Sequence, residues 1–315
     1  MKAVIINEFG GLDKLQLTEV DTPKPTADQV LVKVFACAIN PVDYKLREGA
    51  LQEIVQFEFP RILGGDISGV ITELGKDVTD FKVGDEVFFS AHLEQNGGYA
   101  EYCVVDPSII AKKPTSISHV EAASLPVVGL TSLQALRDFG GMKPGSKVLI
   151  HAGAGGVGSF AIQYAKAMGA EVFTTASASK RDYVKSLGAD HVIDYSKEDF
   201  VKVAQDAGGI DITFETVGGE NYAKSVLATN QSGSIPCIVN PPDADVKELA
   251  DQKNIKTDFM LLTGIRKDLE EIASLVDQGK IKPTVSQVLA LEEVRKGHEL
   301  IQSGRTQGKL VIKIV

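Results

Sequence analysis

The stretch Gly153-Ala154-Gly155-Gly156-Val157-Gly158 decides the fold of this chain. Its Gly-x-Gly-x-x-Gly spacing lies between a β-branched run, Lys147 to Ala152, and a run with apolar residues at helical spacing, Val157 to Met168. A second β-branched run, Glu171 to Ala176, follows. Glycines at such a strand-to-helix turn let the backbone approach a pyrophosphate, which the helix N-terminus attracts. The context therefore predicts a dinucleotide site formed by Gly153, Ala154, Gly155, Gly156 and Val157.

Strands and helices continue to alternate after this turn. Further strand-like runs are His191 to Tyr195, Asp211 to Val217 and Ile235 to Val239. The alternation predicts an α/β fold with a doubly wound parallel sheet, which we place at residues 123–264. Pro236 is an anomaly in this pattern, because proline removes a ladder donor from a central strand.

Residues 1–122 show a different pattern of strand-like runs and turn residues. Short β-branched or alternating runs are separated by glycine and proline, which predicts a β-rich, barrel-like domain. The runs are Lys2 to Ile6, Gln29 to Ala38, Asp66 to Leu74, Asp85 to Ser90 and Tyr99 to Val105. The tail, residues 265–315, contains two helical and two strand-like runs, and we expect it to complete the first domain.

Composition narrows the class of protein. The chain has 315 residues, of which 43% are hydrophobic and 24% charged, as is usual for a soluble globular protein of about two domains. The net charge of −9 argues against a nonspecific nucleic-acid or anionic-membrane surface. Three scattered cysteines form no disulfide framework, and no apolar stretch is long enough to span a membrane. We therefore expect a cytoplasmic protein with neither nucleic acid nor membrane as partner.

The turn after the second strand of the alternating region bears on the choice of dinucleotide. An NAD site usually has Asp or Glu there, about 20 residues beyond the glycines, to bind the ribose 2′-hydroxyl. Here the turn instead carries Ser177, Lys180 and Arg181. A hydroxyl and two cations suit a 2′-phosphate, so the sequence favours NADP, with Ser177 and Lys180 as its contacts. The alternative is that Ser179 caps the next helix and the two cations are solvated.

Several further motifs, in this order along the chain, resemble the medium-chain dehydrogenase/reductase superfamily, and more narrowly its zinc-free branch of quinone oxidoreductases, which includes zeta-crystallin-like and enone reductase-like proteins. They are Asn40-Pro41-Val42-Asp43, Gly64-Gly65-Asp66, Gly84-Asp85-Glu86-Val87, Gly129-Leu130-Thr131, Val217-Gly218-Gly219 and Gln307-Gly308-Lys309-Leu310-Val311. The resemblance covers nearly the whole chain. It implies a GroES-like first domain and a Rossmann second domain.

The resemblance also bears on metal. Zinc members of the superfamily carry a catalytic cysteine and histidine where this chain has Asn40 and Gly65, neither of which can replace a thiolate or imidazole ligand. The segment between Val87 and Tyr99, where a four-cysteine lobe would lie, contains no cysteine. We therefore expect no metal site, and we interpret the five histidines as surface or capping residues.

The resemblance implies that the turn at Asn40 lines the active-site cleft, near the nicotinamide. Hydride transfer to an enone or quinone places negative charge on an oxygen, which requires hydrogen-bond donors. Asn40 and Tyr44 are the candidate catalytic donors. The alternatives are that Asn40 and Asp43 merely cap a helix and that Tyr44 packs against its apolar face.

The resemblance assigns further cofactor contacts. Thr131 corresponds to a threonine near the nicotinamide ribose, Tyr195 to a tyrosine beside the adenosine phosphate, and Arg305 to an arginine at the 2′-phosphate. Val217 begins the turn Val217-Gly218-Gly219, which matches a turn of the family, and we expect it to contact the cofactor. The alternatives are a hydroxyl of Thr131 that bonds back to its own helix and edge packing for Tyr195.

These observations predict an NADPH-dependent reductase of quinones or α,β-unsaturated carbonyls. A nucleotide-binding protein with a non-enzymatic, crystallin-like or RNA-binding role is the alternative. The apolar run Asp258 to Leu262 is expected to be the last strand of the parallel sheet and hence an edge, which favours a homodimer paired there.

Overall fold

The computed structural model describes residues 1–315, which divide into two compact units. The first comprises Met1–Val127, Gly264–Gly279 and Pro283–Val315, and the second Val128–Thr263 and Lys280–Lys282. The sequence placed the boundary at 122/123 and the whole tail in the first unit. Lys280–Lys282 belong instead to the second unit, because the backbone of Lys282 donates to Gln163 Oε1 (2.9 Å) and accepts from Gln163 Nε2 (3.0 Å).

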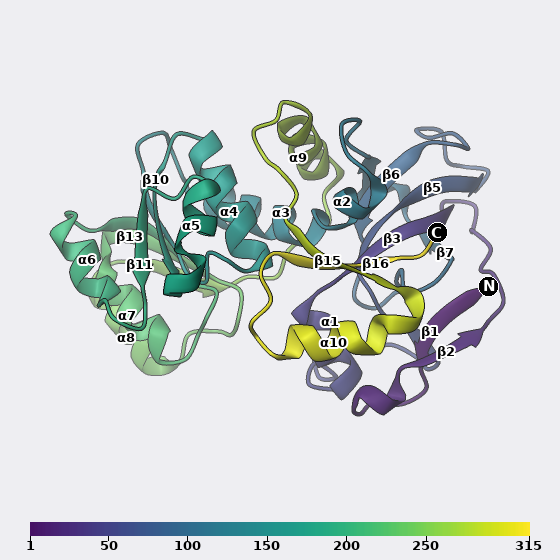
Figure 1. The fold of residues 1–315 in the computed structure, drawn as a ribbon, viewed down its shortest axis with the longest axis horizontal. Coiled ribbons are helices and arrows are strands. Elements are labelled where there is room, and N and C mark those ends of the chain that lie inside the picture. Colours follow the sequence, from purple (N-terminus) through teal and green to yellow (C-terminus); the bar gives the residue numbers. More distant parts are fainter. The chain divides into compact units, whose positions relative to one another are not determined.

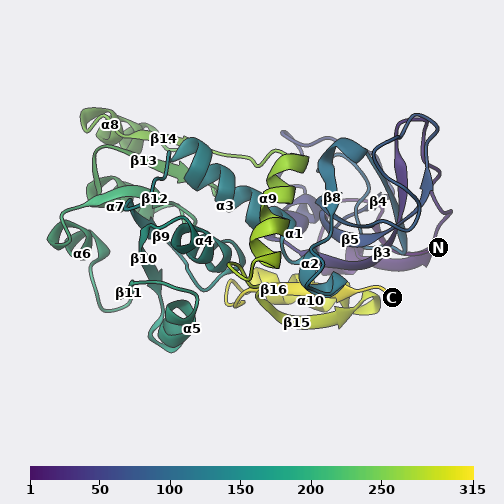
Figure 2. The same ribbon diagram turned by 90° about the horizontal axis from the view of Figure 1, so that it is seen from above.

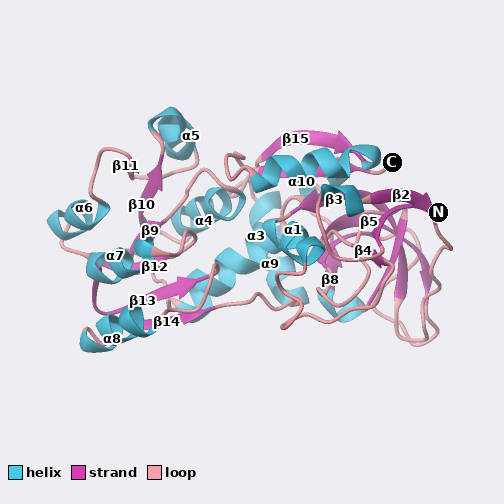
Figure 3. Ribbon diagram, turned by 90° about the horizontal axis from the view of Figure 1, so that it is seen from below, coloured by secondary structure: helices cyan, strands magenta, loops and turns pink.

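The first unit is mostly β-sheet (Figures 1 and 3). Its strands are β1 (Lys2–Ile6), β2 (Gln16–Glu19), β3 (Val30–Ile39), β4 (Arg61–Ile62), β5 (Asp66–Leu74), β6 (Glu86–Ser90), β7 (Tyr102–Val105), β8 (Ile110–Lys112), β15 (Val285–Ala290) and β16 (Lys309–Lys313). Its helices are α1 (Pro41–Glu48), α2 (His119–Ala123), α9 (Arg266–Asp277) and α10 (Val294–Gln302). A seven-stranded sheet has the order β15-β16-β3-β5-β6-β8, with β7 also paired to β3. The tail strand β16 pairs antiparallel with β3, so the end of the chain is part of the first sheet.

The second unit is a parallel sheet between helices. Its strands are β9 (Lys147–Ile150), β10 (Glu171–Ala176), β11 (His191–Asp194), β12 (Ile210–Phe214), β13 (Thr229–Cys237) and β14 (Lys256–Phe259). Its helices are α4 (Gly156–Ala167), α5 (Arg181–Ser186), α6 (Phe200–Asp206), α7 (Glu220–Ala228) and α8 (Ala244–Gln252), and α3 (Pro126–Leu133) enters it from the first unit. Helices α4 and α5 cover one face of the sheet and α6, α7 and α8 the other (Figure 2).

The strand order β11-β10-β9-β12-β13-β14 is the 3-2-1-4-5-6 order of the classic doubly wound sheet. The predicted fold class, a β-rich domain plus a Rossmann-type parallel sheet, is therefore confirmed. In such a sheet the order reverses between the first and fourth strands, here β9 and β12, and ligands bind beyond the carboxyl ends of the strands at that point.

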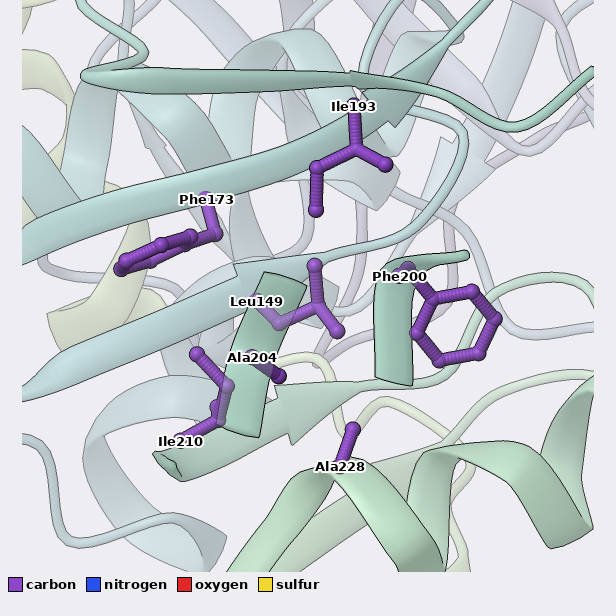
Figure 4. Close-up of a cluster of buried hydrophobic side chains, with 7 residues drawn as sticks. All are labelled: Leu149, Phe173, Ile193, Phe200, Ala204, Ile210 and Ala228. Carbon is purple, nitrogen blue, oxygen red and sulfur yellow. The ribbon is translucent and has the colours of Figure 1, made fainter. Parts of the chain in front are cut away.

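Apolar side chains from four adjacent strands explain why α6 covers this sheet. Figure 4 shows Leu149, Phe173, Ile193 and Ile210, one from each strand, facing Phe200 and Ala204 of α6 and Ala228 of α7. All seven are buried. Every second residue of a strand faces the same side of the sheet, so each of the four strands contributes an apolar side chain to this layer.

Pro236 lies in β13, an interior strand between β12 and β14. The regular β12–β13 ladder ends at the pair Ile212–Ser234 and resumes only as an isolated bridge between Glu215 and Cys237. The missing proline N–H falls in this gap, so the ladder is interrupted where its donor is absent. The strand is also longer than predicted, because it begins at Thr229 rather than Ile235.

Candidate functional site

The glycine loop joins β9 to α4, and its glycines have different roles. A β-carbon on Gly153 would lie 2.0 Å from Thr174 Oγ1, and one on Gly158 would lie 2.5 Å from the Ala152 carbonyl oxygen. A β-carbon on Gly155 would meet only that carbonyl, at 3.3 Å. Gly153 and Gly158 therefore allow close packing of helix and strand, and Gly155 keeps the surface of the loop open.

The start of α4 presents free backbone donors. The Gly155 N–H donates to the Ala152 carbonyl (2.9 Å) and the Ser159 N–H to the Gly155 carbonyl (2.9 Å). The N–H groups of Gly156, Val157 and Gly158 have no backbone acceptor, as is expected for the first turn of a helix. A twelve-residue helix with free N–H groups and an open glycine turn suits a phosphate group.

We expect Gly158→Ala to destabilise the protein, because the added methyl group would press on backbone atoms of Ala152 and Gly153 that cannot rotate away. Overpacking of this kind costs about 1 to 3 kcal/mol. Chemical denaturation followed by circular dichroism measures the loss. An unchanged free energy of unfolding would contradict the packing role of Gly158.

A cavity of about 650 Å³ lies beside this loop at the carboxyl ends of the strands. Ala152, Thr175, Tyr195 and Val217 line it, each just after or at the end of a different strand from β9 to β12. The remaining lining residues are 196–200, Asn221 and Lys224. Tyr195 is 63% exposed, so it is available to a ligand rather than packed at the sheet edge. The cavity occupies the position at which doubly wound sheets bind ligands.

The turn after β10 carries Ser177 and Lys180, the two residues predicted to contact a 2′-phosphate. Ser177 precedes a short 3₁₀ turn, Ala178–Lys180, and Lys180 is its last residue. Lys180 is also the N-cap residue of α5, so Ser179 does not cap that helix. The Ser177 hydroxyl lies 3.1 Å from that of Ser179. Arg181 pairs with Glu198 (3.2 Å), an acid that follows β11 and that the sequence did not place near this turn. Lys180 and Ser177 therefore remain the candidate groups for a 2′-phosphate.

We expect Lys180→Ala to weaken NADPH binding roughly tenfold at low salt, since a charged contact at an exposed site contributes about 1.4 kcal/mol or less. NADH affinity should not change, because NADH has no 2′-phosphate. The effect should shrink as salt screens the contact. Fluorescence titration with both nucleotides measures it, and Lys185→Ala, on the adjoining helix α5, is the matched control. Equal losses for NADPH and NADH would contradict the assignment.

In the first unit, Asn40 belongs to a buried polar cluster with Asp66 and Lys309. The Asn40 amide donates to Asp66 Oδ2 (2.9 Å), and its oxygen accepts from Lys309 Nζ, which also contacts Asp66 Oδ2 (2.9 Å). All three side chains are at most 4% exposed. The sequence missed this cluster because its members come from β16, β5 and the start of α1. The lysine that begins the closing strand, before the apolar residues Leu310 to Ile312, was the one available signal.

Asp43 caps α1, as the sequence indicated, and its carboxylate also binds groups outside that helix. Its carboxylate accepts from the Asn40 N–H (2.7 Å), the Gly64 N–H (3.2 Å) and the Tyr99 hydroxyl (3.0 Å). Burial raises the pKa of the Asp43 carboxyl to about 6, although these hydrogen bonds oppose the shift. The Asn40 side chain makes no cap bond of its own, because Asp66 and Lys309 hold it.

The raised pKa of Asp43 predicts a pH dependence of stability. Because the folded state binds the proton more tightly than the unfolded state, Asp43 contributes stability that is present near pH 4 and lost as the pH rises through about 6. We expect the free energy of unfolding of the wild type, relative to Asp43→Asn, to fall by on the order of 2 kcal/mol between pH 4.5 and pH 7. Parallel denaturation series test this, and a constant difference would contradict it.

The other expected site residues are placed as follows. Tyr44 is half-buried on α1, and its hydroxyl makes no hydrogen bond within the chain. Thr131 is 9% exposed, and it is the neighbouring Ser132 that bonds back to the helix, at Val128 (2.7 Å). Arg305 is exposed on the loop before β16, in the first unit. The hydroxyls of Tyr44 and Thr131 are thus not used by the fold.

Two histidines correct the sequence interpretation, and one of them lies near a buried carboxylate. His151 and His298 are buried, not surface or capping residues. His298 lies against Arg47 (3.1 Å), and burial lowers its pKa to about 3. Glu215, the residue after β12, is fully buried as well. His151 and Glu215 meet through Ser225 behind the cavity.

No group of three or more His, Cys, Asp or Glu side chains is arranged to hold a metal ion. None of the helices has the length and apolar character that crossing a membrane requires.

Family models match both units. Residues 26–115 match the alcohol dehydrogenase GroES-like domain, and residues 187–312 match the zinc-binding dehydrogenase family. The 2-methylene-furan-3-one reductase of Solanum lycopersicum is 33% identical, over 99% of this chain and 79% of its own length.

Solved structures agree with these matches. The quinone oxidoreductase of Coxiella burnetii has a TM-score of 0.91 and 37% identity, over 100% of this chain and 99% of that one. The Escherichia coli quinone oxidoreductase, solved in complex with NADPH, has a TM-score of 0.89 and 27% identity, over 99% and 100%. With the glycine loop and the cavity, these relatives show an oxidoreductase that uses a nicotinamide cofactor. The chain belongs to the medium-chain dehydrogenase/reductase superfamily, with quinone oxidoreductases among its relatives.

Proposed function

We propose that the protein is a zinc-independent, NADPH-dependent reductase of quinones or α,β-unsaturated carbonyls. The observation that carries the proposal is the glycine loop with its free N–H groups beside a cavity at the switch point of the sheet. The preference for NADPH is supported by Ser177 and Lys180 after β10, in a turn that has no Asp or Glu of its own between residues 177 and 181. The nearby acid Glu198 is paired with Arg181. Related proteins named for quinone and enone reduction support the substrate class.

The chain's own residues would bind and orient the reactants. A bound NADPH would supply the hydride. The first turn of α4 would bind its pyrophosphate, and the cavity between Tyr195 and Val217 its adenosine half. The Thr131 hydroxyl is available to the nicotinamide ribose.

Reduction of a conjugated carbonyl leaves negative charge on its oxygen, and donors must face it. The Tyr44 hydroxyl has no partner within the chain and can donate. The Asn40 amide has two N–H groups, of which one is bound to Asp66, so one remains. Lys309 and Asp66 fix the orientation of this amide.

We also propose a homodimer paired at the edge of the parallel sheet. The strand β14 does lie at the edge, as expected, but it is Lys256–Phe259 and carries two charged residues. The apolar residues Met260, Leu261 and Leu262 follow the strand, and Leu261 is 61% exposed. A partner would cover these residues.

The proposed activity is tested by mixing the protein with NADPH and a panel of quinones and enones while following the absorbance of the reduced nicotinamide. We expect turnover with at least one class, weaker turnover with NADH, and no change after a strong chelator. Tight binding of NADPH without turnover across the panel would instead favour a non-enzymatic nucleotide-binding role. Loss of activity on chelation, restored by zinc, would overturn zinc independence.

A further inference from the structure

Four buried side chains form a continuous hydrogen-bonded chain behind the cavity of the second unit. Thr175 Oγ1 lies 3.1 Å from His151 Nδ1, His151 Nε2 lies 3.0 Å from Ser225 Oγ, and Ser225 Oγ lies 2.6 Å from Glu215 Oε2. None of the four is more than 3% exposed. We call this set, Thr175-His151-Ser225-Glu215, the relay.

The direction of each hydrogen bond in the relay can be assigned by starting from Glu215, the end at which a carboxylate accepts. The Glu215 carboxylate also accepts from the N–H groups of Val217 (2.8 Å) and Gly218 (2.9 Å) and from Asn221 Nδ2 (2.8 Å). With Ser225, four donors converge on this one buried carboxyl group. The Ser225 hydroxyl has two acceptors within reach, Glu215 Oε2 at 2.6 Å and the Asn221 carbonyl oxygen at 3.0 Å. We assign its single proton to the shorter contact, so Ser225 donates to Glu215 and accepts from His151 Nε2–H.

The hydrogen bonds at the Thr175 end of the relay are consistent with this assignment. With its proton on Nε2, a neutral His151 accepts at Nδ1 from the Thr175 hydroxyl, whose oxygen already accepts from the Ala152 N–H (3.1 Å). Burial lowers the pKa of His151, which favours this neutral form. Every proton of the relay then has one acceptor, and a single tautomer satisfies the whole chain.

The relay joins two parts of the cavity wall that come from different strands. Thr175 lines one wall at the end of β10, and its carbonyl also accepts from the Gly153 N–H of the glycine loop (3.0 Å). Val217 and Asn221 line the other wall, and both donate to Glu215. Because Asn221 gives one amide N–H to Glu215, the relay also sets which amide atoms Asn221 presents to a ligand.

We propose that His151, Ser225 and Glu215 are positioning residues for the nucleotide: their relay fixes the two walls of the cavity and the orientation of the Asn221 amide. The inference rests on the proposed function, because it takes this cavity as the adenosine site of NADPH. The three residues act through Thr175, Val217 and Asn221, which line the cavity.

The sharpest variant is Ser225→Ala. Ser225 is fully buried and does not line the cavity, so it can act on a ligand only through the groups to which it is hydrogen-bonded, His151, Glu215 and the Asn221 carbonyl (3.0 Å). We expect the dissociation constant of NADPH, measured by fluorescence titration of the full chain, to rise roughly tenfold. Ser234→Ala is the matched control, since Ser234 is a buried serine of the same sheet that bonds to Gly140 (3.3 Å) outside the relay. It should bind NADPH as the wild type does.

A second variant, Glu215→Gln, keeps the shape of the side chain but places an amide N–H against Ser225 or Asn221. Either Ser225 must reverse its proton or the Asn221 amide must flip, so NADPH should again bind roughly tenfold or more weakly. Glu171→Gln is its control, because Glu171 pairs with His191 (2.7 Å) at the surface end of β10, away from the cavity. It should leave binding unchanged.

A double-mutant cycle separates a connected relay from independent packing effects. Thr175→Val and Ser225→Ala alter residues that meet only through His151. If the relay acts as one unit, the dissociation constant of NADPH in the double variant should equal that of the single variant with the larger loss of affinity. Multiplying losses would overturn the inference, as would wild-type affinity in both Ser225→Ala and Glu215→Gln.

Two further outcomes are informative. A wild type that does not bind NADPH overturns the proposed function itself, whereas a wild type that binds alongside unaffected variants overturns only the relay. If the buried variants do not fold, Thr175→Ser and Thr175→Val decide, since serine keeps the hydroxyl that His151 requires. Equal affinity in these two variants would contradict the relay.

Discussion

Replacing Gly155 with valine is expected to weaken NADPH binding by at least roughly a hundredfold, about 2.7 kcal/mol, while the protein remains folded. Gly155 has φ −75° and ψ 176°, a conformation open to any residue, and its β-carbon would meet only the Ala152 carbonyl. The added side chain would stand over the free N–H groups of α4, where the pyrophosphate is to bind. Equilibrium fluorescence titration measures the affinity, and thermal melting verifies the fold.

The chain offers a matched control for this variant. Gly11 begins a short 3₁₀ turn with φ −74° and ψ −172°, and a β-carbon there would meet only the flexible side chain of Asp13. Gly11→Val should therefore bind NADPH as the wild type does. Wild-type affinity in a folded Gly155→Val protein would show that the glycine loop is not the phosphate site.

Tyr44→Phe is expected to lower kcat by roughly ten- to a hundredfold and to leave NADPH affinity unchanged. Removing one donor to a developing oxyanion costs about a hundredfold or more, and the remaining N–H of Asn40 would reduce that loss. Because the hydroxyl has no partner within the chain, its removal should not alter stability. Steady-state kinetics with a slow substrate, together with NADPH titration, measures the two effects separately.

Tyr102→Phe serves as the control for Tyr44→Phe, since Tyr102 is also half-buried in the first unit but lies on β7. Its kcat should equal that of the wild type. An unchanged kcat in Tyr44→Phe would return Tyr44 to a packing role.

The local parts of the fold could be predicted from the sequence. The strands Asp66–Leu74 and Glu171–Ala176 have the predicted bounds, because β-branched runs that end at glycine or a polar turn carry their own limits. The glycine loop was equally local, since its signal is the spacing of glycines between a strand and a helix.

The buried polar groups could not be predicted, because they depend on contacts between distant segments. Lys309 meets Asn40 and Asp66 only because β16 returns to pair with β3. His151 and Glu215 follow β9 and β12, and they become neighbours only once the order of the parallel strands is known. In the sequence each is a single polar residue after an apolar run, a pattern that surface residues share.

The central claim, reduction of a conjugated carbonyl by hydride transfer from NADPH, is tested most directly by isotope transfer. The protein is incubated with an enone and NADPH that carries deuterium at one or the other position of nicotinamide C4, and the product is analysed by mass spectrometry and NMR. We predict that one of the two labelled cofactors gives a saturated ketone with one deuterium on the β-carbon, the proton on the α-carbon coming from water. A saturated product without deuterium from either labelled cofactor would contradict the account.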